Sequence, residues 1–138
     1  MLRKNMGLYR GKRRDTGEWV EGYLAGYDLI CPGEPQDVSH ATGEYYGETP
    51  YVGFIEVDPS TVGRFTGQPD KNGKRVFEGD IVSTGKERRV VRFRNGAFEL
   101  LRRASGVTMY DLVGTDVEYE VIGDIHDKPE LLEVNEND

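Results

Sequence analysis

The stretch TGQPDKNGKRVFEGDIV at residues 66–82 combines glycine and lysine in a way that could bind a phosphate group. A loop of the form Gly-x-x-x-x-Gly-Lys-Ser/Thr holds such an anion with backbone N–H groups at the start of a helix. Here Gly67 and Gly73 are six positions apart instead of five, and Lys74 is followed by arginine and then by strand-forming residues. The pattern therefore predicts a tight turn at Asn72-Gly73 rather than a phosphate site.

Asp124 and His126, in the segment GDIHD, are spaced to bind a metal ion. Side chains two residues apart on a strand point to one side, and the segment resembles the Gly-Asp-x-His-Gly motif of metallophosphoesterases. A two-metal site needs several more ligands, but the only other histidine is His40. The favoured interpretation is a polar strand end before a short helix, with no metal and no cofactor. A small metal-dependent hydrolase using Asp124 and His126 is the alternative.

Two further sets of residues could take part in catalysis. Cys31 and His40 could form a nucleophile and base, but no third group that orients the histidine can be identified. Glu78 and Asp80 flank a glycine and could share one face of a strand, as paired carboxylates do in hydrolases. Solvated charges at a strand edge explain the second pair as well. We therefore expect no catalytic residues and no enzymatic activity.

Asn95-Gly96 lies between two alternating runs in VVRFRNGAFEL and predicts a two-residue type I′ hairpin. Such a loop fixes the register of the two strands. The expected pairs are Arg94 with Ala97, Phe93 with Phe98, Arg92 with Glu99, and Val91 with Leu100. Apolar side chains then share one face of the hairpin, and the charged side chains share the other.

Asn72-Gly73 predicts a second hairpin of the same kind, with Asp70 opposite Arg75. Its turn carries two lysines, and the first hairpin carries two arginines on its charged face. The candidate interaction surface therefore consists of Lys71, Lys74, Arg92 and Arg94.

The other elements follow from alternation, β propensity and helix-capping residues. Further strands are expected within residues 6–10, 18–24, 51–57, 80–84 and 117–125. Asp58-Pro59-Ser60-Thr61 predicts one helical turn, and Asp127 with Glu130 predicts a short helix in PELLEV. Residues 31–50, rich in proline, glycine and acids, are expected to form a long loop suited to partner binding, and residues 135–138 an acidic tail.

The net charge of -7 conceals strong segregation along the chain of 138 residues. Residues 1–14 carry +6 and residues 86–103 carry +5, whereas residues 15–85 and 104–138 carry -9 each. The two basic segments could form a patch that binds nucleic acid, or they could neutralise their acidic neighbours. Some of six aromatic residues could stack on bases or fill a protein interface, although core packing is the default for large aromatic side chains. They are Trp19, Tyr23, Tyr27, Tyr45, Tyr46 and Tyr51.

The cysteine content and the hydropathy of the sequence indicate a cellular compartment. Cys31 is the single cysteine, so no internal disulfide can form, and no apolar run is long enough for a membrane span or a signal peptide. We expect a cytoplasmic protein without a membrane association. Abundant glycine, aromatic residues and β-branched runs indicate a mostly-β protein, and the length fits one domain.

Four segments follow one another along the chain: YRGKRRDTGEWVEGYL, PSTVGRFTGQPDKNGKRVFEGDIV, the VVRFRNGAFEL hairpin and EVIGDIHDKPELL. Together they resemble the YopX family of phage and prophage proteins. The resemblance implies a small, mostly-β protein of phage origin in a bacterial host, and it brings no catalytic or ligand residues. Similar sequences tend to read Gly-Asn-Ile-Tyr-Glu-Asn-Pro-Glu-Leu where this chain has residues 123–131.

We thus expect a single mostly-β domain at residues 1–134, an antiparallel, barrel-like sheet that is SH3-like in its C-terminal half, followed by a short helix. The expected function is that of an accessory module that binds a host or phage protein, or nucleic acid. Assembly into a homo-oligomer through strand edges is compatible with this expectation.

Overall fold

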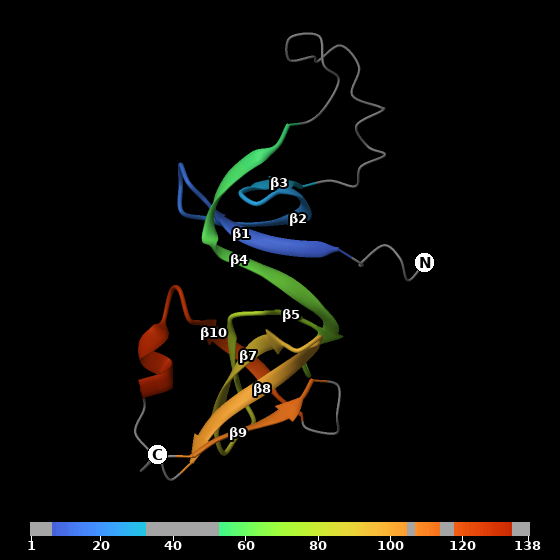
Figure 1. Cartoon of the computed structure of the whole chain (residues 1–138). Helices are drawn as coiled ribbons and strands as arrows, with labels where there is room; N and C mark the ends of the chain where they lie inside the picture. The colour runs from blue at the N-terminus through green and yellow to red at the C-terminus, as the bar shows by residue number, and fades with distance from the viewer. Residues whose placement is uncertain (1–6, 33–52, 105–106, 114–117, 134–138) are drawn as a thin grey trace. The chain divides into compact units, whose positions relative to one another are not determined.

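The computed structural model describes residues 7–32, 53–104, 107–113 and 118–133, and these residues form antiparallel β-strands almost throughout (Figure 1). The mostly-β prediction is confirmed. The chain divides into two compact units, Met1–Arg64 and Phe65–Asp138. None of the helices formed by the described residues is long and apolar enough to cross a membrane.

The first unit contains four strands whose pairings form a closed ring. They are β1 (Leu8–Arg13), β2 (Trp19–Gly26), β3 (Leu29–Cys31) and the first part of β4 (Ile55–Pro69). β1 pairs with β2 and β4, and β3 also pairs with β2 and β4. Ile30 and Val57 are fully buried at the centre of this unit. Gly22 is needed here, because a Cβ at this position would lie 2.1 Å from the carbonyl oxygen of Cys31.

The helical turn predicted at residues 58–61 is wrong, because these residues belong to β4. The Asp58 carboxylate accepts the Ser60 N–H at 3.0 Å, as a helix cap would. The Thr61 hydroxyl, however, accepts the N–H of Lys12 on β1 at 2.9 Å, where the β1–β4 register shifts. The polar side chains therefore stabilise an irregularity in a strand, because pairing with β1 satisfies more backbone groups than one isolated helical turn would.

The second unit contains the end of β4 and a five-stranded sheet in the order β10-β6-β7-β8-β9. Its strands are β5 (Arg75–Phe77), β6 (Asp80–Ser83), β7 (Arg88–Arg94), β8 (Ala97–Ala104), β9 (Val107–Leu112) and β10 (Glu120–Asp124). The end of β4 pairs with β5. The core is formed by Val76, Val82, Val91, Leu100 and Tyr119. The pairings define antiparallel sheets, and an SH3-like barrel in this half stays a prediction.

The β7–β8 hairpin has the predicted register at all four pairs. Asn95 and Gly96 both have positive φ, 54° and 82°, as a type I′ turn requires. Val91 and Leu100 are buried, and the rings of Phe93 and Phe98 pack 4.8 Å apart on the same face. Local turn chemistry and the two-residue side-chain period thus agree in this hairpin.

The β4–β5 turn is also present, but its predicted register is wrong by one position. Arg75 pairs with Pro69 instead of Asp70. Asp70 and Lys74 close a three-residue loop through an N–H···O bond of 2.8 Å, and within that loop positive φ occurs at Gly73 and not at Asn72. The buried Asp70 carboxylate explains the difference, because it accepts the N–H groups of Asn72 and Lys74 and so favours the longer loop.

The predicted short C-terminal helix is a 3-10 helix, η3 (Pro129–Glu133). Leu131 packs against Gly123 of β10, where a Cβ would lie 2.8 Å from the Leu131 Cδ1 atom. Arg88 of β7 donates a hydrogen bond of 3.1 Å to the Leu131 carbonyl oxygen. These two contacts hold η3 against β10 and β7.

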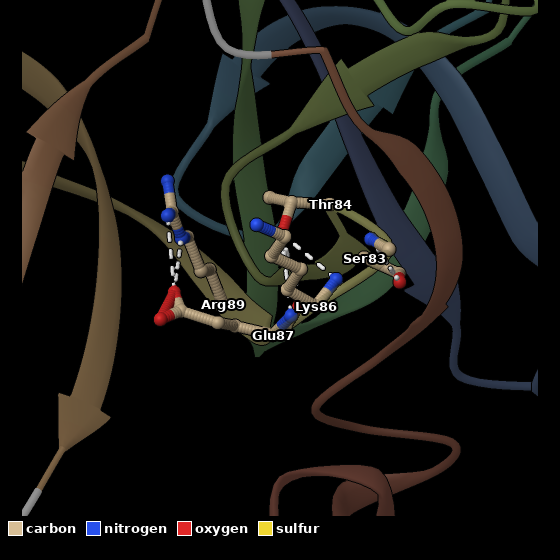
Figure 2. Close-up of polar contacts among 6 residues, drawn as sticks. Ser83, Thr84, Lys86, Glu87 and Arg89 are labelled. Carbon is tan, nitrogen blue, oxygen red and sulfur yellow. Dashed lines mark hydrogen bonds and ion pairs between the residues drawn. The ribbon is translucent and has the colours of Figure 1, made fainter.

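The β6–β7 turn is stabilised by its own side chains (Figure 2). The Thr84 hydroxyl accepts the N–H groups of Lys86 and Glu87 at 3.4 and 3.2 Å, and Gly85 has φ 95°. Arg89 donates to the Glu87 carboxylate through two nitrogens, at 3.2 and 3.0 Å. Arg89 is buried, so part of the positive charge of residues 86–103 lies inside the unit rather than on its surface.

Candidate interaction surface

The charged face of the β7–β8 hairpin carries an Arg-Glu-Arg cluster, formed by Arg92, Glu99 and Arg94. Arg92 lies directly across from Glu99 in the register, with Nη2 3.6 Å from Oε1. Arg94 donates to the other oxygen, Oε2, at 3.2 Å. The carboxylate is buried, with its side chain 6% exposed, whereas the two arginine side chains are 40% and 42% exposed. A buried carboxylate therefore holds two guanidinium groups that reach solvent.

The cluster has a formal charge of +1, and both of its arginine side chains reach solvent. Two of the buried atoms, Arg92 Nε and Glu99 Oε1, have no hydrogen-bond partner in the part of the chain that the structure describes. Each guanidinium carries five N–H donors, and the carboxylate contacts one nitrogen of each. Glu99 thus orients both arginines, and their partly exposed side chains can approach a carboxylate or carbonyl group of a partner.

The two lysines of the candidate surface lie at the β4–β5 turn, and both are exposed. Lys71 Nζ lies 3.8 Å from the Glu120 carboxylate at the start of β10. The backbone N–H of Lys74 donates to Asp70. The described contacts join the two arginines to each other through Glu99, but they do not join either lysine to that cluster.

The turn that first suggested a phosphate site uses its amide groups internally. Asp70 Oδ1 accepts the N–H groups of Asn72 and Lys74, and the Gly73 N–H donates to the Asp70 carbonyl oxygen at 3.0 Å. An anion would have to displace a carboxylate of the same chain. The turn interpretation is therefore supported over a phosphate-binding loop.

Asp124 and His126 have a structural arrangement at the end of β10. The buried Asp124 carboxylate accepts the backbone N–H groups of His126 and Asp127 through Oδ1, each at 2.8 Å. This closes the turn that leads into η3. Among the residues that the structure describes, no group of three or more His, Cys, Asp and Glu side chains could hold a metal ion. The geometry thus gives no support to the hydrolase alternative.

The other candidate catalytic residues are placed as follows. Asp80 is buried and accepts the Phe77 N–H at 2.7 Å, whereas Glu78 lies in the turn between the two strands. Cys31 is buried in β3 as a free thiol. His40 lies outside the described residues, as do Tyr45, Tyr46 and Tyr51.

The aromatic residues of the first unit differ in how they are used. The Arg10 guanidinium lies over the Trp19 ring at 4.3 Å, so a face of this ring is occupied and is not open for stacking on a base. Tyr27 is 76% exposed at the β2–β3 turn.

A hollow of about 350 Å³ in the first unit is lined by residues 13–15 and 54–56. Its Arg13 is bound to Asp15 by two hydrogen bonds of 2.9 Å.

Asp70 is a polar residue that the sequence analysis did not single out, and its carboxylate links the β4–β5 turn to β10. Its Oδ2 accepts the N–H of Val121 on β10 at 2.9 Å. Burial alone would raise the pKa of this carboxyl, but the hydrogen bonds from Val121, Lys74 and Asn72 outweigh burial and hold the pKa below its usual value. Burial, together with the Asp70 charge, raises the pKa of Tyr119. The signal in the sequence was Asp-x-Asn-Gly, which is typical of a side-chain-stabilised turn.

Comparison with known proteins places the chain in a family. One solved structure, protein EF1440 from Enterococcus faecalis, is 24% identical over 90% of this chain and 96% of its own, with a TM-score of 0.41. No curated protein matches the chain. The YopX protein family matches residues 8–133, which is nearly the whole chain. The chain therefore belongs to the YopX protein family.

Proposed function

We propose that this chain is a non-enzymatic accessory module that binds a protein partner through the Arg-Glu-Arg cluster. The observation that carries the proposal is the pairing of the predicted basic surface with carboxylates. Glu99 holds both arginines, and Glu120 lies beside Lys71. A mixed-charge surface of this kind suits the polar rim of a protein interface.

The same pairing disfavours nucleic acid as the partner. Binding to a phosphate backbone draws its energy from cations that neutralise phosphates and release counterions. Here an acidic group neutralises part of the charge beforehand, and Arg89 is bound internally to Glu87. Family membership supports an accessory role, and the resemblance noted in the sequence also underlies our proposal of a phage or prophage origin and of a cytoplasmic site of action.

The first test is direct binding to nucleic acid. Labelled single-stranded and double-stranded oligonucleotides are titrated with the protein at low and at physiological salt, and fluorescence anisotropy is recorded. We expect no saturable binding at physiological salt. Saturable binding that weakens steeply with salt and is abolished by Arg92→Ser would overturn the choice of a protein partner.

The second test is affinity capture from bacterial cells that produce the tagged protein. We compare the wild type, the double variant Arg92→Ser/Arg94→Ser and the control Lys86→Ser, which removes one exposed cation from the neighbouring β6–β7 turn. A partner protein that survives nuclease treatment, is retained by the control and is lost by the double variant supports the proposal. Capture that the double variant leaves unchanged contradicts it. Circular dichroism verifies that all three proteins are folded.

A further inference from the structure

The chain contains two Asn-Gly turns with very different hydrogen bonding. We infer that Asn95-Gly96 is a site of spontaneous covalent modification, in which Asn95 deamidates and the backbone rearranges to isoaspartate, whereas the fold protects Asn72-Gly73. The inference rests on the geometry of the two turns and goes beyond the proposed function.

The reaction needs only the chain and water. The backbone nitrogen of the glycine attacks the side-chain carbonyl carbon of the asparagine, a C–N bond forms, and the C–NH2 bond breaks. The amide proton and the NH2 group leave together as ammonia, and a five-membered cyclic imide remains. Water then opens the imide at either carbonyl, which gives aspartate or isoaspartate. Glycine favours the attack because it has no Cβ to obstruct the approach.

The Asn95-Gly96 turn leaves the reacting groups unrestrained. Both residues are exposed at the tip of the β7–β8 hairpin. Among the described residues, neither the Gly96 N–H nor the Asn95 side chain has a hydrogen-bond partner. Attack requires the two residues to leave their φ values of 54° and 82° briefly. A two-residue tip without such bonds is the part of a hairpin that opens at the lowest cost.

The Asn72-Gly73 turn holds its corresponding groups in place. The Gly73 nitrogen, which would be the nucleophile, donates its proton to the Asp70 carbonyl oxygen at 3.0 Å. The Asn72 N–H donates to Asp70 Oδ1 at 2.8 Å. Asp70 is itself fixed by Val121 of β10. Reaction here requires these bonds to break first, so the turn is protected although its residues are exposed.

The product would act on the Arg-Glu-Arg cluster. Isoaspartate places one more carbon in the backbone of a two-residue loop, so the type I′ geometry and its register cannot be retained. It also adds a carboxylate next to Arg94, whose Nη2 lies 3.2 Å from Glu99 Oε2. The formal charge of the cluster falls from +1 to zero. If the proposed function holds, ageing at Asn95 weakens partner binding.

The experiment measures the two sites side by side in one molecule. The folded protein is incubated at mildly alkaline pH, digested, and analysed by peptide mass spectrometry, with an isoaspartyl methyltransferase assay to identify the product. A parallel sample is incubated in urea, where both Asn-Gly pairs are unfolded. In the folded protein we expect Asn95 to react at least roughly fivefold faster than Asn72, since one net hydrogen bond is worth about a factor of five. In urea we expect comparable rates.

Three results would contradict preferential deamidation at Asn95. Equal rates at the two sites in the folded protein, faster reaction at Asn72, or no reaction at Asn95 while the urea sample reacts would each overturn the inference. The variant Asn95→Gln should abolish isoaspartate formation at this turn. Asn95→Asp adds the charge without the extra backbone carbon and so separates the two effects on partner binding. Loss of the proposed function leaves the measured rates unaffected, so the two claims fail independently.

Discussion

The carboxylate of Asp70 and the backbone N–H of Val121 are joined by a hydrogen bond of 2.9 Å across 51 residues of sequence. The other carboxylate oxygen accepts the N–H groups of Asn72 and Lys74. One buried side chain therefore closes the β4–β5 turn and attaches this turn to the start of β10.

The variant Asp70→Ala should lower the free energy of unfolding by about 2–4 kcal/mol, because three backbone N–H groups lose their acceptor. Urea denaturation at neutral pH measures the change. Asp15→Ala is the control, since this carboxylate is 65% exposed and pairs with the neighbouring Arg13. Its effect should be much smaller, because solvent screens an exposed ion pair. Equal effects of the two variants would contradict the role of Asp70.

Acid should weaken the second unit through the same residue. The folded-state pKa of Asp70 lies below the unfolded value of about 3.9. Its stabilising contribution is therefore fully present above the unfolded pKa and is lost as the pH falls through the folded pKa. The stability difference between wild type and Asp70→Asn should be constant above about pH 5 and shrink below it. A difference that stays constant throughout the acid range would show that the carboxylate charge is not involved.

The β7–β8 hairpin could be predicted because interactions between residues close in sequence determine it. The β7–β8 register follows from Asn95-Gly96 and the alternation around it, and both depend on neighbours in sequence. At Asn72-Gly73 the same dipeptide takes another loop length, because the Asp70 carboxylate accepts the N–H groups of Asn72 and Lys74. The bond from Val121 to the same carboxylate is a long-range contact that no local pattern reveals. Residues 58–61 have the sequence of a helix cap but belong to strand β4, because Lys12 of the distant strand β1 donates its backbone N–H to Thr61.

The candidate surface was predictable to a similar extent. The register predicted that Arg92 faces Glu99, and this pairing is found. The diagonal contact from Arg94 to the same carboxylate and the burial of Glu99 depend on how the whole unit packs. The sequence thus predicted one Arg-Glu pair on the charged face, and the structure adds the second arginine to the same carboxylate.

The coupling between Arg94 and Glu99 can be measured with a double-mutant cycle of Arg94→Ala and Glu99→Ala. We expect an interaction free energy of about 0.5–1.5 kcal/mol, since the carboxylate is buried but the arginine is nearly half exposed. Glu99→Ala alone should cost about 1–3 kcal/mol, because it leaves two like charges side by side. Thermal unfolding followed by circular dichroism gives the four values. Strict additivity would exclude the ion pair.

Gly22→Ala should disrupt the first unit. A Cβ at residue 22 would lie 2.1 Å from the Cys31 carbonyl oxygen and 2.7 Å from the Pro32 Cα atom, and a paired backbone cannot move aside. We expect a loss of about 3 kcal/mol or more in unfolding free energy, the upper range for overpacking. Gly26→Ala on the same strand is the control, because its nearest neighbour is a Leu29 methyl group at 3.7 Å. Similar unfolding curves for the two variants would contradict the packing argument.

Substitutions at Asp124 and His126 distinguish a structural role of these residues from a role in metal binding. Asp124→Ala removes the acceptor of two backbone N–H groups and should cost about 1–3 kcal/mol. His126→Ala keeps the N–H that Asp124 bonds, so its effect should be smaller, within about 1 kcal/mol. A metal site predicts a different pattern, in which manganese or zinc raises the melting temperature of the wild type and either substitution abolishes that increase. We expect unequal losses of stability and no metal-dependent shift. One oxygen of the Asp124 carboxylate already accepts the two N–H groups that form the turn into η3, and no further metal ligands lie beside it among the residues that the structure describes.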